Sequence, residues 1–176
     1  MKFQRLFGIL LLAPVLWAGC KKTEKVENTT PVYAVDVSEP QQAQPKLPTI
    51  KLWVGPLEMN SEMAVTPRQI QTGMMFRKTM GEDESMIFVL PYPQEADFWM
   101  KNCSVPLSVA YIDPQGVIAE IHDLEPFNTN SVISASQNIL FALEVPQGWF
   151  KRHDVHPGMT IRTERGSLAE TFGKNP

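Results

Sequence analysis

Alternating apolar and polar positions recur along the chain from residue 49 onward. A period of two is typical of β-strands that bury one face. The cleanest strand is residues 139–145, where Ile139, Phe141, Leu143 and Val145 share one face and Glu144 lies on the other with Leu140 and Ala142. The full pattern predicts short strands at residues 49–54, 57–65, 86–90, 97–101, 107–112, 117–121, 139–145 and 159–163.

Turn and cap residues divide these strands. Asp113-Pro114-Gln115-Gly116 carries Pro and Gly where a tight turn favours them, which predicts a hairpin. Thr66 can cap a helix over residues 67–72, with Gln69 completing a capping box, and a second helical turn is expected at 149–153. We therefore expect a mainly β domain, a compact antiparallel β-sandwich or partly open barrel with one or two short helices.

The first twenty residues have the layout of a secretory signal. Lys2 and Arg5 precede an uncharged apolar run over residues 6–16, too short to span a bilayer, and Ala18-Gly19-Cys20 follows. A cysteine after two small residues resembles the bacterial lipobox, in which that cysteine is acylated and becomes the first residue. This predicts a removed signal peptide (1–19) and a membrane anchor on lipidated Cys20; the alternative is an ordinary signal peptide with a coincidental cysteine.

The chain then divides into three parts. Residues 20–48 are rich in Pro and Gln and lack apolar periodicity, so we expect a disordered tether. Residues 49–168 form the single expected domain, and 169–176 a C-terminal tail. The predicted location is the cell envelope, on the periplasmic face of the outer membrane if the cell is Gram-negative.

Composition excludes some partners and cofactors. The formal net charge is −3 with no basic block, which argues against nucleic acid. Cys103 is the only cysteine apart from Cys20, so no internal disulfide is expected once Cys20 is acylated. We predict no cofactor and no metal. The methionines near Cys103 are better suited to core packing than to Cu(I), and residues 153–156 read as a surface turn rather than a zinc site.

Several motifs resemble one family. Gly73-Met74-Met75-Phe76-Arg77, Phe98-Trp99-Met100-Lys101-Asn102 and Val105-Pro106-Leu107 follow, in order, the pattern of the bacterial and archaeal domain of unknown function 192, DUF192. The resemblance implies a small, mainly β domain without an established reaction. Ser85 replaces the usual Gly, Cys103 the usual Thr, and Ser108 the usual Asp. The last departure puts a shared carboxylate-dependent catalysis in doubt.

The candidate ligand-binding residues are Arg77, Trp99, Lys101, Asn102 and Glu144. Their convergence would give an aromatic wall, two cations, an amide and a carboxylate, which suit a small-molecule site. The alternative is that Arg77 or Lys101 pairs with Glu144 structurally, while Trp99 covers the edge of the sheet. Cys103 as a nucleophile would need a base, and the surrounding residues favour a small, half-buried side chain.

Three functions follow, in order of preference. The first is a non-catalytic, lipid-anchored envelope domain that binds a small molecule or an envelope protein through these residues. The second is an enzyme on an envelope substrate with Glu144 as acid or base, which predicts a cleft and a shifted pKa. The third is a structural or docking lipoprotein, which predicts a flat apolar patch that includes Trp149 and Phe150.

Overall fold

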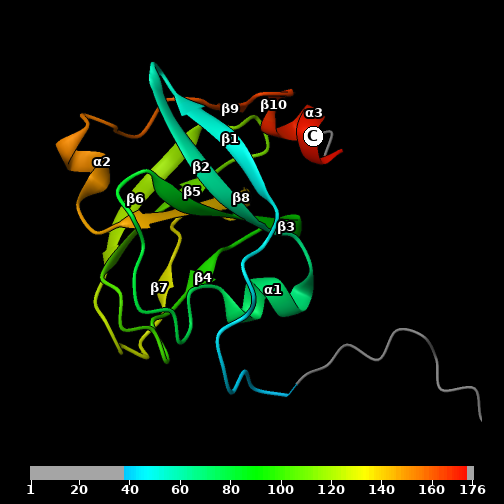
Figure 1. Ribbon diagram of the computed structural model, residues 1–176. Helices are drawn as coiled ribbons and strands as arrows, with labels where there is room; N and C mark the ends of the chain where they lie inside the picture. Colours follow the sequence, from blue (N-terminus) through cyan, green and yellow to red (C-terminus); the bar gives the residue numbers. More distant parts are fainter. Residues whose placement is uncertain (1–37, 174–176) are drawn as a thin grey trace, which may run out of the picture. The chain divides into compact units, whose positions relative to one another are not determined.

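The computed structural model describes residues 38–173, and these residues build one large sheet and a two-stranded ribbon. The large sheet has the order β10-β9-β1-β2-β3-β8-β5-β6, and β4 pairs with β7 (Figure 1). The strands are β1 (Thr49–Val54), β2 (Leu57–Ala64), β3 (Glu84–Gln94), β4 (Asp97–Phe98), β5 (Leu107–Ile112), β6 (Ile118–Leu124), β7 (Val132–Ile133), β8 (Ile139–Pro146), β9 (Ile161–Thr163) and β10 (Gly166–Ser167). The helices are α1 (Pro67–Thr72), α2 (Trp149–Arg152) and α3 (Leu168–Phe172).

The predicted fold class is confirmed as mainly β with short helices, with two differences. The sheet is mixed, because β2 and β3 run parallel and are joined through α1, whereas the other strand pairs are antiparallel. Parallel neighbours need a crossover connection, and residues 65–83 supply it. The described residues also contain a third helix, α3, which begins at the end of the predicted domain and runs into the predicted tail.

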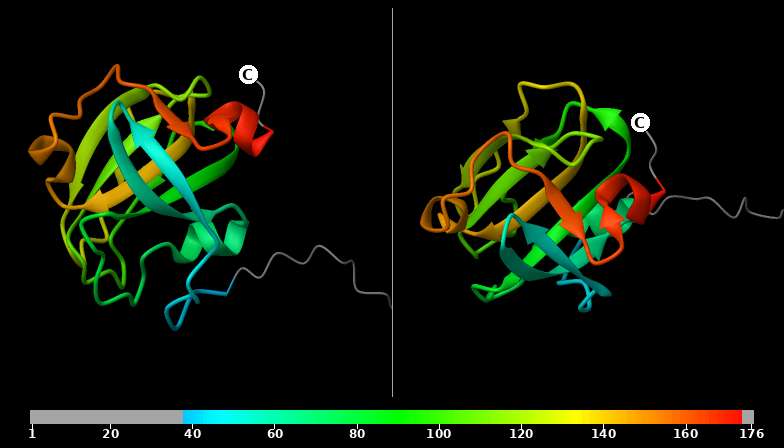
Figure 2. Two further views of the ribbon diagram at one scale, coloured as in Figure 1. Left: turned by 45° about the horizontal axis from the view of Figure 1, so that its top comes forward. Right: turned by 90° about the horizontal axis from the view of Figure 1, so that it is seen from above.

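The large sheet curls until its two ends approach each other (Figure 2). Val117, just before β6, forms an isolated bridge with Thr160, just before β9. Ile118 N–H donates to the Met159 carbonyl at 2.8 Å, and Ile161 N–H donates to the Gly116 carbonyl at 2.8 Å. These contacts join the ends at one point without a continuous ladder, so the sheet stays an open barrel.

Local sequence explains where the elements begin and turn. Thr66 and Gln69 form the expected capping box at α1, and Gly73 ends that helix. The Asp113 carboxylate accepts from the N–H groups of Gln115 and Val117 at 2.9 and 2.8 Å, which fixes the hairpin between β5 and β6. Both signals were correctly predicted because each depends on neighbouring residues alone.

Both faces of the central strands β3, β8 and β5 are buried. One face looks into the curled sheet, where Ile87, Phe141 and Leu143 pack with residues of β1, β9, α2 and α3. The opposite face, with Phe88 and Ala142 among its side chains, is covered by α1, the segment after it, and residues 96–105. We call these the closed face and the covered face. Glu144 lies on the covered face, one residue from Leu143 on the closed face.

The predicted N-terminal processing concerns residues that the structure does not describe. The signal peptide, Cys20 and most of the tether lie outside residues 38–173. The described end of the tether contacts the domain: the Gln44 side-chain amide donates to the Gly73 carbonyl at 2.9 Å, and Leu47 N–H donates to Glu62 at 2.7 Å. None of the helices within residues 38–173 is long and apolar enough to cross a membrane.

Candidate functional site

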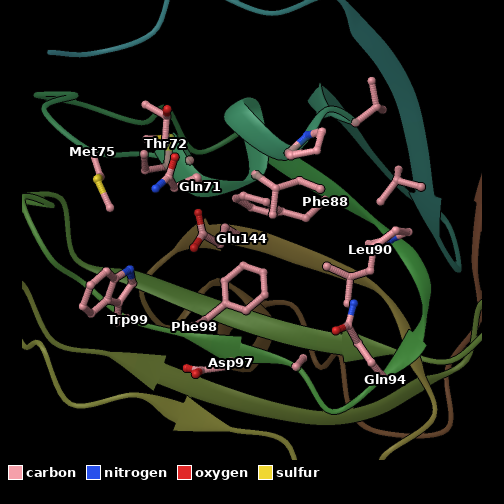
Figure 3. Close-up of a pocket in the computed structure, with 18 of the residues that line it drawn as sticks. Gln71, Thr72, Met75, Phe88, Leu90, Gln94, Asp97, Phe98, Trp99 and Glu144 are labelled. Carbon is pink, nitrogen blue, oxygen red and sulfur yellow. The ribbon is translucent and has the colours of Figure 1, made fainter. Parts of the chain in front are cut away.

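A pocket of about 720 Å³ opens on the covered face, between α1 and the segment that leads into β4. Its lining is mostly apolar and includes Ile70, Met75 and Leu90. Figure 3 shows Glu144 in the middle of this lining, among Phe88, Phe98 and Trp99. Pockets of this size and character commonly enclose small organic ligands.

Glu144 is the central polar group of the pocket. It sits within β8, which is flanked by β3 and β5, so its backbone is fully enclosed by the sheet. Only 4% of the residue is exposed, and the buried oxygen Oε2 has no hydrogen-bond partner among the described residues. Burial raises the pKa of this carboxyl to about 8, because the charged form loses its hydration. At neutral pH the side chain is therefore largely a protonated acid.

The titratable side chains nearest to Glu144 are neutral as well. Burial, with a smaller effect of Glu144, raises the pKa of the Cys103 thiol to about 12. Burial and Glu144 also raise the pKa of Tyr111, whose hydroxyl donates to the Val132 carbonyl at 2.5 Å. Neither group can supply a counter-charge to Glu144, and a thiol with this pKa is a poor nucleophile.

Aromatic rings form two sides of the pocket. Phe88 of β3 meets Phe98 of β4 edge to face, with ring centroids 5.0 Å apart, and Phe98 lies 5.7 Å from Tyr111. These contacts fix the rings in place. Trp99, next along the chain, is 44% exposed and lies at the rim. A half-exposed Trp beside an apolar pocket offers a large contact area that is still available to a ligand.

The lining that the structure describes contains acidic side chains but no basic ones. Glu95 and Asp97 are exposed at the rim, and Glu144 lies at the centre. The lining that the structure describes contains no Lys, Arg or His. Gln71, Thr72 and Gln94 are its other polar side chains. The pocket is thus apolar and acidic, with the buried acid among the aromatic side chains in Figure 3.

The structure brings two of the five predicted site residues to this pocket. Trp99 and Glu144 both line it, whereas Arg77, Lys101 and Asn102 do not. Arg77 instead forms a two-pronged ion pair with Glu62, at 2.8 and 3.1 Å, in which both side chains are nearly buried. The proposed structural pairing of Arg77 with Glu144 is therefore absent.

Lys101 and Asn102 have other positions near the rim. The Lys101 ammonium pairs with Glu39 and lies 5.3 Å from the centre of the Trp99 ring, so Trp99 and Lys101 share a side as expected. Asn102 adopts a left-handed backbone with φ of 58°, a conformation that Asn tolerates well. Its carbonyl accepts from Phe76 N–H at 2.8 Å, which ties the two DUF192-like motifs together beside the pocket.

The three departures from the family pattern have different surroundings. Ser108 pairs with Val145 of the closed face and donates to Asp123, while its oxygen accepts from Gly148 N–H at 2.8 Å. A carboxylate at position 108 would therefore not lie in the pocket. Ser85 is buried and donates to the Asn60 carbonyl at 3.4 Å. Only Cys103 lines the pocket.

Two other sequence-based alternatives can be compared with the structure. Trp149 and Phe150 are only 4% and 2% exposed, so the predicted apolar docking patch does not include them; they belong to the closed-face core instead. Within the described residues, no three His, Cys, Asp or Glu side chains are grouped as a metal site would need. The Met74, Met86 and Met100 side chains are buried in the covered-face core.

Comparison with known proteins gives the family. The family model DUF192, described as an uncharacterized ACR, matches residues 51–163. The chain belongs to the DUF192 family. The matched range runs from β1 to β9 and contains nearly the whole large sheet, the two motifs tied by Phe76 and Asn102, and Glu144. DUF192 membership carries no established activity.

Solved structures resemble this DUF192 domain. A proposed transcription regulator from Sinorhizobium meliloti 1021 is 28% identical, with a TM-score of 0.61, over 65% of this chain and 92% of that one. A protein of unknown function from Novosphingobium aromaticivorans DSM 12444 is 26% identical, with a TM-score of 0.59, over 65% of this chain and 83% of that one. No curated protein matches the chain.

Sequence reasoning missed much of the pocket. Phe88, Phe98 and Leu90 were read only as strand residues, and Thr72 and Gln71 only as part of a short helix. One signal was present: Glu144 is the only ionisable residue in an otherwise apolar strand, residues 139–146. A lone carboxyl in such a strand is costly to bury, which makes it a candidate for function.

Proposed function

We propose that this protein is a lipid-anchored domain of the cell envelope that binds a small, largely apolar molecule in the pocket of the covered face. The observation that carries the proposal is the combination of an apolar pocket of about 720 Å³ with Glu144, whose buried oxygen has no partner. A stable domain rarely leaves a buried polar atom unpaired, and a ligand group would supply the missing partner.

The chemistry of the pocket supports binding more than catalysis. The nearest candidate nucleophile, Cys103, has a pKa of about 12, and the described lining contains no His that could act as its base. The proposed regulator activity of the S. meliloti relative is not extended to this chain, because a net charge of −3 disfavours nucleic acid.

The enzyme alternative rests on one observation, the raised pKa of Glu144. A carboxyl with a pKa of about 8 holds its proton at neutral pH and could donate it to a bound substrate. The binder proposal predicts that the bound molecule leaves chemically unchanged. Recovery of a chemically altered molecule, with no product from Glu144→Gln protein, would favour the enzyme instead.

The anchor and the pocket are tested separately. Wild-type chain is expected to sediment with membranes and Cys20→Ser chain to remain in the supernatant; membrane association of both would contradict the anchor. The soluble Cys20→Ser chain is then titrated with Nile red, a neutral apolar dye whose fluorescence rises on burial. We expect saturable binding at one dye per chain.

Two tryptophan variants assign the dye to the pocket. Trp99→Ala removes a rim ring and should weaken Nile red binding by roughly tenfold, the effect of about 1.4 kcal/mol. Trp53→Ala is the matched control, because Trp53 lies on β1, outside the pocket lining, and stacks with Arg162 at 5.1 Å. Equal effects of the two variants, or no saturable binding, would contradict the proposal.

A further inference from the structure

The ionisable groups of the pocket point to the class of its ligand. Glu95, Asp97 and Glu144 line it, and the described lining has no cationic side chain. The carboxylates of Glu95 and Asp97 at the mouth give a potential that attracts cations and repels anions, and the apolar walls strengthen this field. Lys101, whose ammonium lies beside the ring of the rim residue Trp99, is already paired with Glu39.

Glu144 adds an observation independent of the rim charges. It is more than nine-tenths buried, it lies among the side chains that line the pocket, and its Oε2 atom has no partner (Figure 3). Among the described residues, no Lys, Arg or His pairs with it, because Arg77 pairs with Glu62 and Lys101 with Glu39. The described residues therefore leave this oxygen open to a group of a bound molecule.

The aromatic walls suit the same kind of ligand. Phe88, Phe98 and Trp99 surround Glu144 in the close-up view. Aromatic faces attract ammonium groups as well as apolar surface. The Trp99 ring shows this already, because the Lys101 ammonium lies 5.3 Å from its centre.

Building on the proposed function, we infer that the pocket takes an organic cation: an apolar body that carries a protonated amine, with the ammonium group at Glu144. The apolar body fills the space between α1 and the aromatic rings, and the ammonium donates to the unpaired carboxyl oxygen. A ligand with an ammonium group is favoured over a neutral ligand with a hydrogen-bond acceptor, because every ionisable group of the lining is an acid.

Binding is coupled to release of a proton. Glu144 is protonated in the empty pocket, and an ammonium group favours its ionised form, so the proton leaves to solvent as the ion pair forms. The other titratable groups close to Glu144 are Cys103, in the segment after β4, and Tyr111 of β5; both are neutral because their pKa values are raised. Asp97 of β4 and Glu120 of β6 face Tyr111. Amine affinity should therefore rise with pH by up to about tenfold per unit below about pH 8.

The test compares three rigid probes with one skeleton. 1-Adamantanamine, 1-adamantanol and 1-adamantanecarboxylate are titrated calorimetrically into the full chain in the same buffer. We expect the amine to bind at least roughly tenfold more tightly than the alcohol, and the carboxylate to bind most weakly. The amine affinity should rise between about pH 6 and pH 8, while the alcohol affinity stays constant.

Variants connect the preference to one residue. Glu144→Gln should remove most of the amine's advantage and its pH dependence, while the alcohol changes by less than about threefold. Glu120→Gln is the control, because Glu120 lies on β6, outside the pocket, and pairs with His122 at 2.8 Å. It should leave the preference intact.

Failure of this inference can be distinguished from failure of the proposed function. Equal binding of amine and alcohol, or tightest binding of the carboxylate, would overturn the organic-cation inference while the pocket remains a binding site. An amine preference that survives Glu144→Gln would overturn the assignment to Glu144. No binding of any of the three probes, together with no saturable Nile red binding, would overturn both.

Discussion

The two faces of the central strands β3, β8 and β5 are covered in different ways. On the closed face, Phe141, Leu143 and Val145 are fully buried against the curled sheet and its helices. On the covered face, the neighbouring residues Ala142 and Glu144 meet a cover built from α1 and the segments around β4, and this cover leaves a pocket. A sheet that packs on itself buries its side chains completely, whereas a cover of loops and short elements leaves room for a ligand.

The polar groups follow the same division. The closed face satisfies its buried hydroxyl at Ser108, which contacts both Asp123 and Gly148. The covered face holds Glu144 with an unpaired buried oxygen. The closed face also holds one unpaired hydroxyl, that of Ser61, but among the unpaired buried atoms of the described residues only Glu144 Oε2 belongs to a residue that lines the pocket.

The largest expected effect compares one leucine from each face. Leu143→Ala creates a cavity in the fully packed core and should lower the free energy of unfolding by about 3–5 kcal/mol. Leu90→Ala removes the same atoms from the pocket wall, where space already exists, and should cost about 1–2 kcal/mol. Urea unfolding of both variants checks this. Equal losses would mean that the two faces are packed alike.

The next prediction concerns Glu144, whose replacement should stabilise the chain by an amount that depends on pH. Glu144 has a pKa of about 8 in the folded chain against its usual 4.5. Between these values the folded state retains a proton that the unfolded state has lost, so this carboxyl lowers stability progressively as pH rises. Glu144→Gln removes the dependence and should stabilise the chain at pH 8 by on the order of 4 kcal/mol.

Urea unfolding of wild type and Glu144→Gln at pH 5 and pH 8 measures this gap. The two proteins should differ by less than about 1 kcal/mol at pH 5, because this pH is only half a unit above the usual pKa of 4.5 in the unfolded state. Glu58→Gln is a suitable control, because Glu58 is an exposed residue of β2 paired with Lys51. A Glu144→Gln protein that is less stable than wild type at both pH values would contradict the account.

Replacement of Arg77 should cause a smaller loss in the free energy of unfolding and should not directly affect binding. Arg77→Ala leaves the nearly buried Glu62 without its two-pronged partner and should cost about 2 kcal/mol. Lys101→Ala breaks a more exposed pair with Glu39 and should cost less than about 1 kcal/mol. Nile red affinity should stay within about threefold of wild type for Arg77→Ala. A tenfold loss of Nile red affinity in the Arg77→Ala variant would show that Arg77 contributes to binding and would contradict this prediction.

The smallest expected change in the free energy of unfolding is that of Trp99→Ala at the pocket rim. Trp99 is 44% exposed, so Trp99→Ala should change the free energy of unfolding by less than about 1 kcal/mol while it weakens ligand binding. Thermal unfolding and Nile red titration on the same preparation measure the two quantities. A stability loss as large as that of Leu143→Ala would assign Trp99 to the core.

The strands were predictable because their signals are local. The alternation in residues 49–54, the turn that follows residues 107–112, and the cap at Thr66 depend on residues that are near neighbours in sequence. The parallel pairing of β2 with β3 and the short strands β7 and β10 were missed, since each depends on contacts between distant segments.

The candidate site was predicted only in part for the same reason. Glu144 stood out as a carboxyl in an apolar strand, but alternation suggested that its face was uncovered. The cover comes from α1 and from residues 96–105, and its position follows from the parallel crossover. Arg77 was grouped with Glu144 because both are charged, whereas the fold places it against Glu62 of the neighbouring β2. The partner of a charge is set by tertiary structure and not by residue type.

The most direct test of a binding pocket on the covered face is native mass spectrometry of the full protein purified from its own cell envelope without refolding. The account predicts a reproducible small organic adduct on the wild-type chain that is lost from Glu144→Gln and Trp99→Ala and retained by Trp53→Ala. A bare mass for the wild-type chain, or an adduct that persists in both pocket variants, would contradict it.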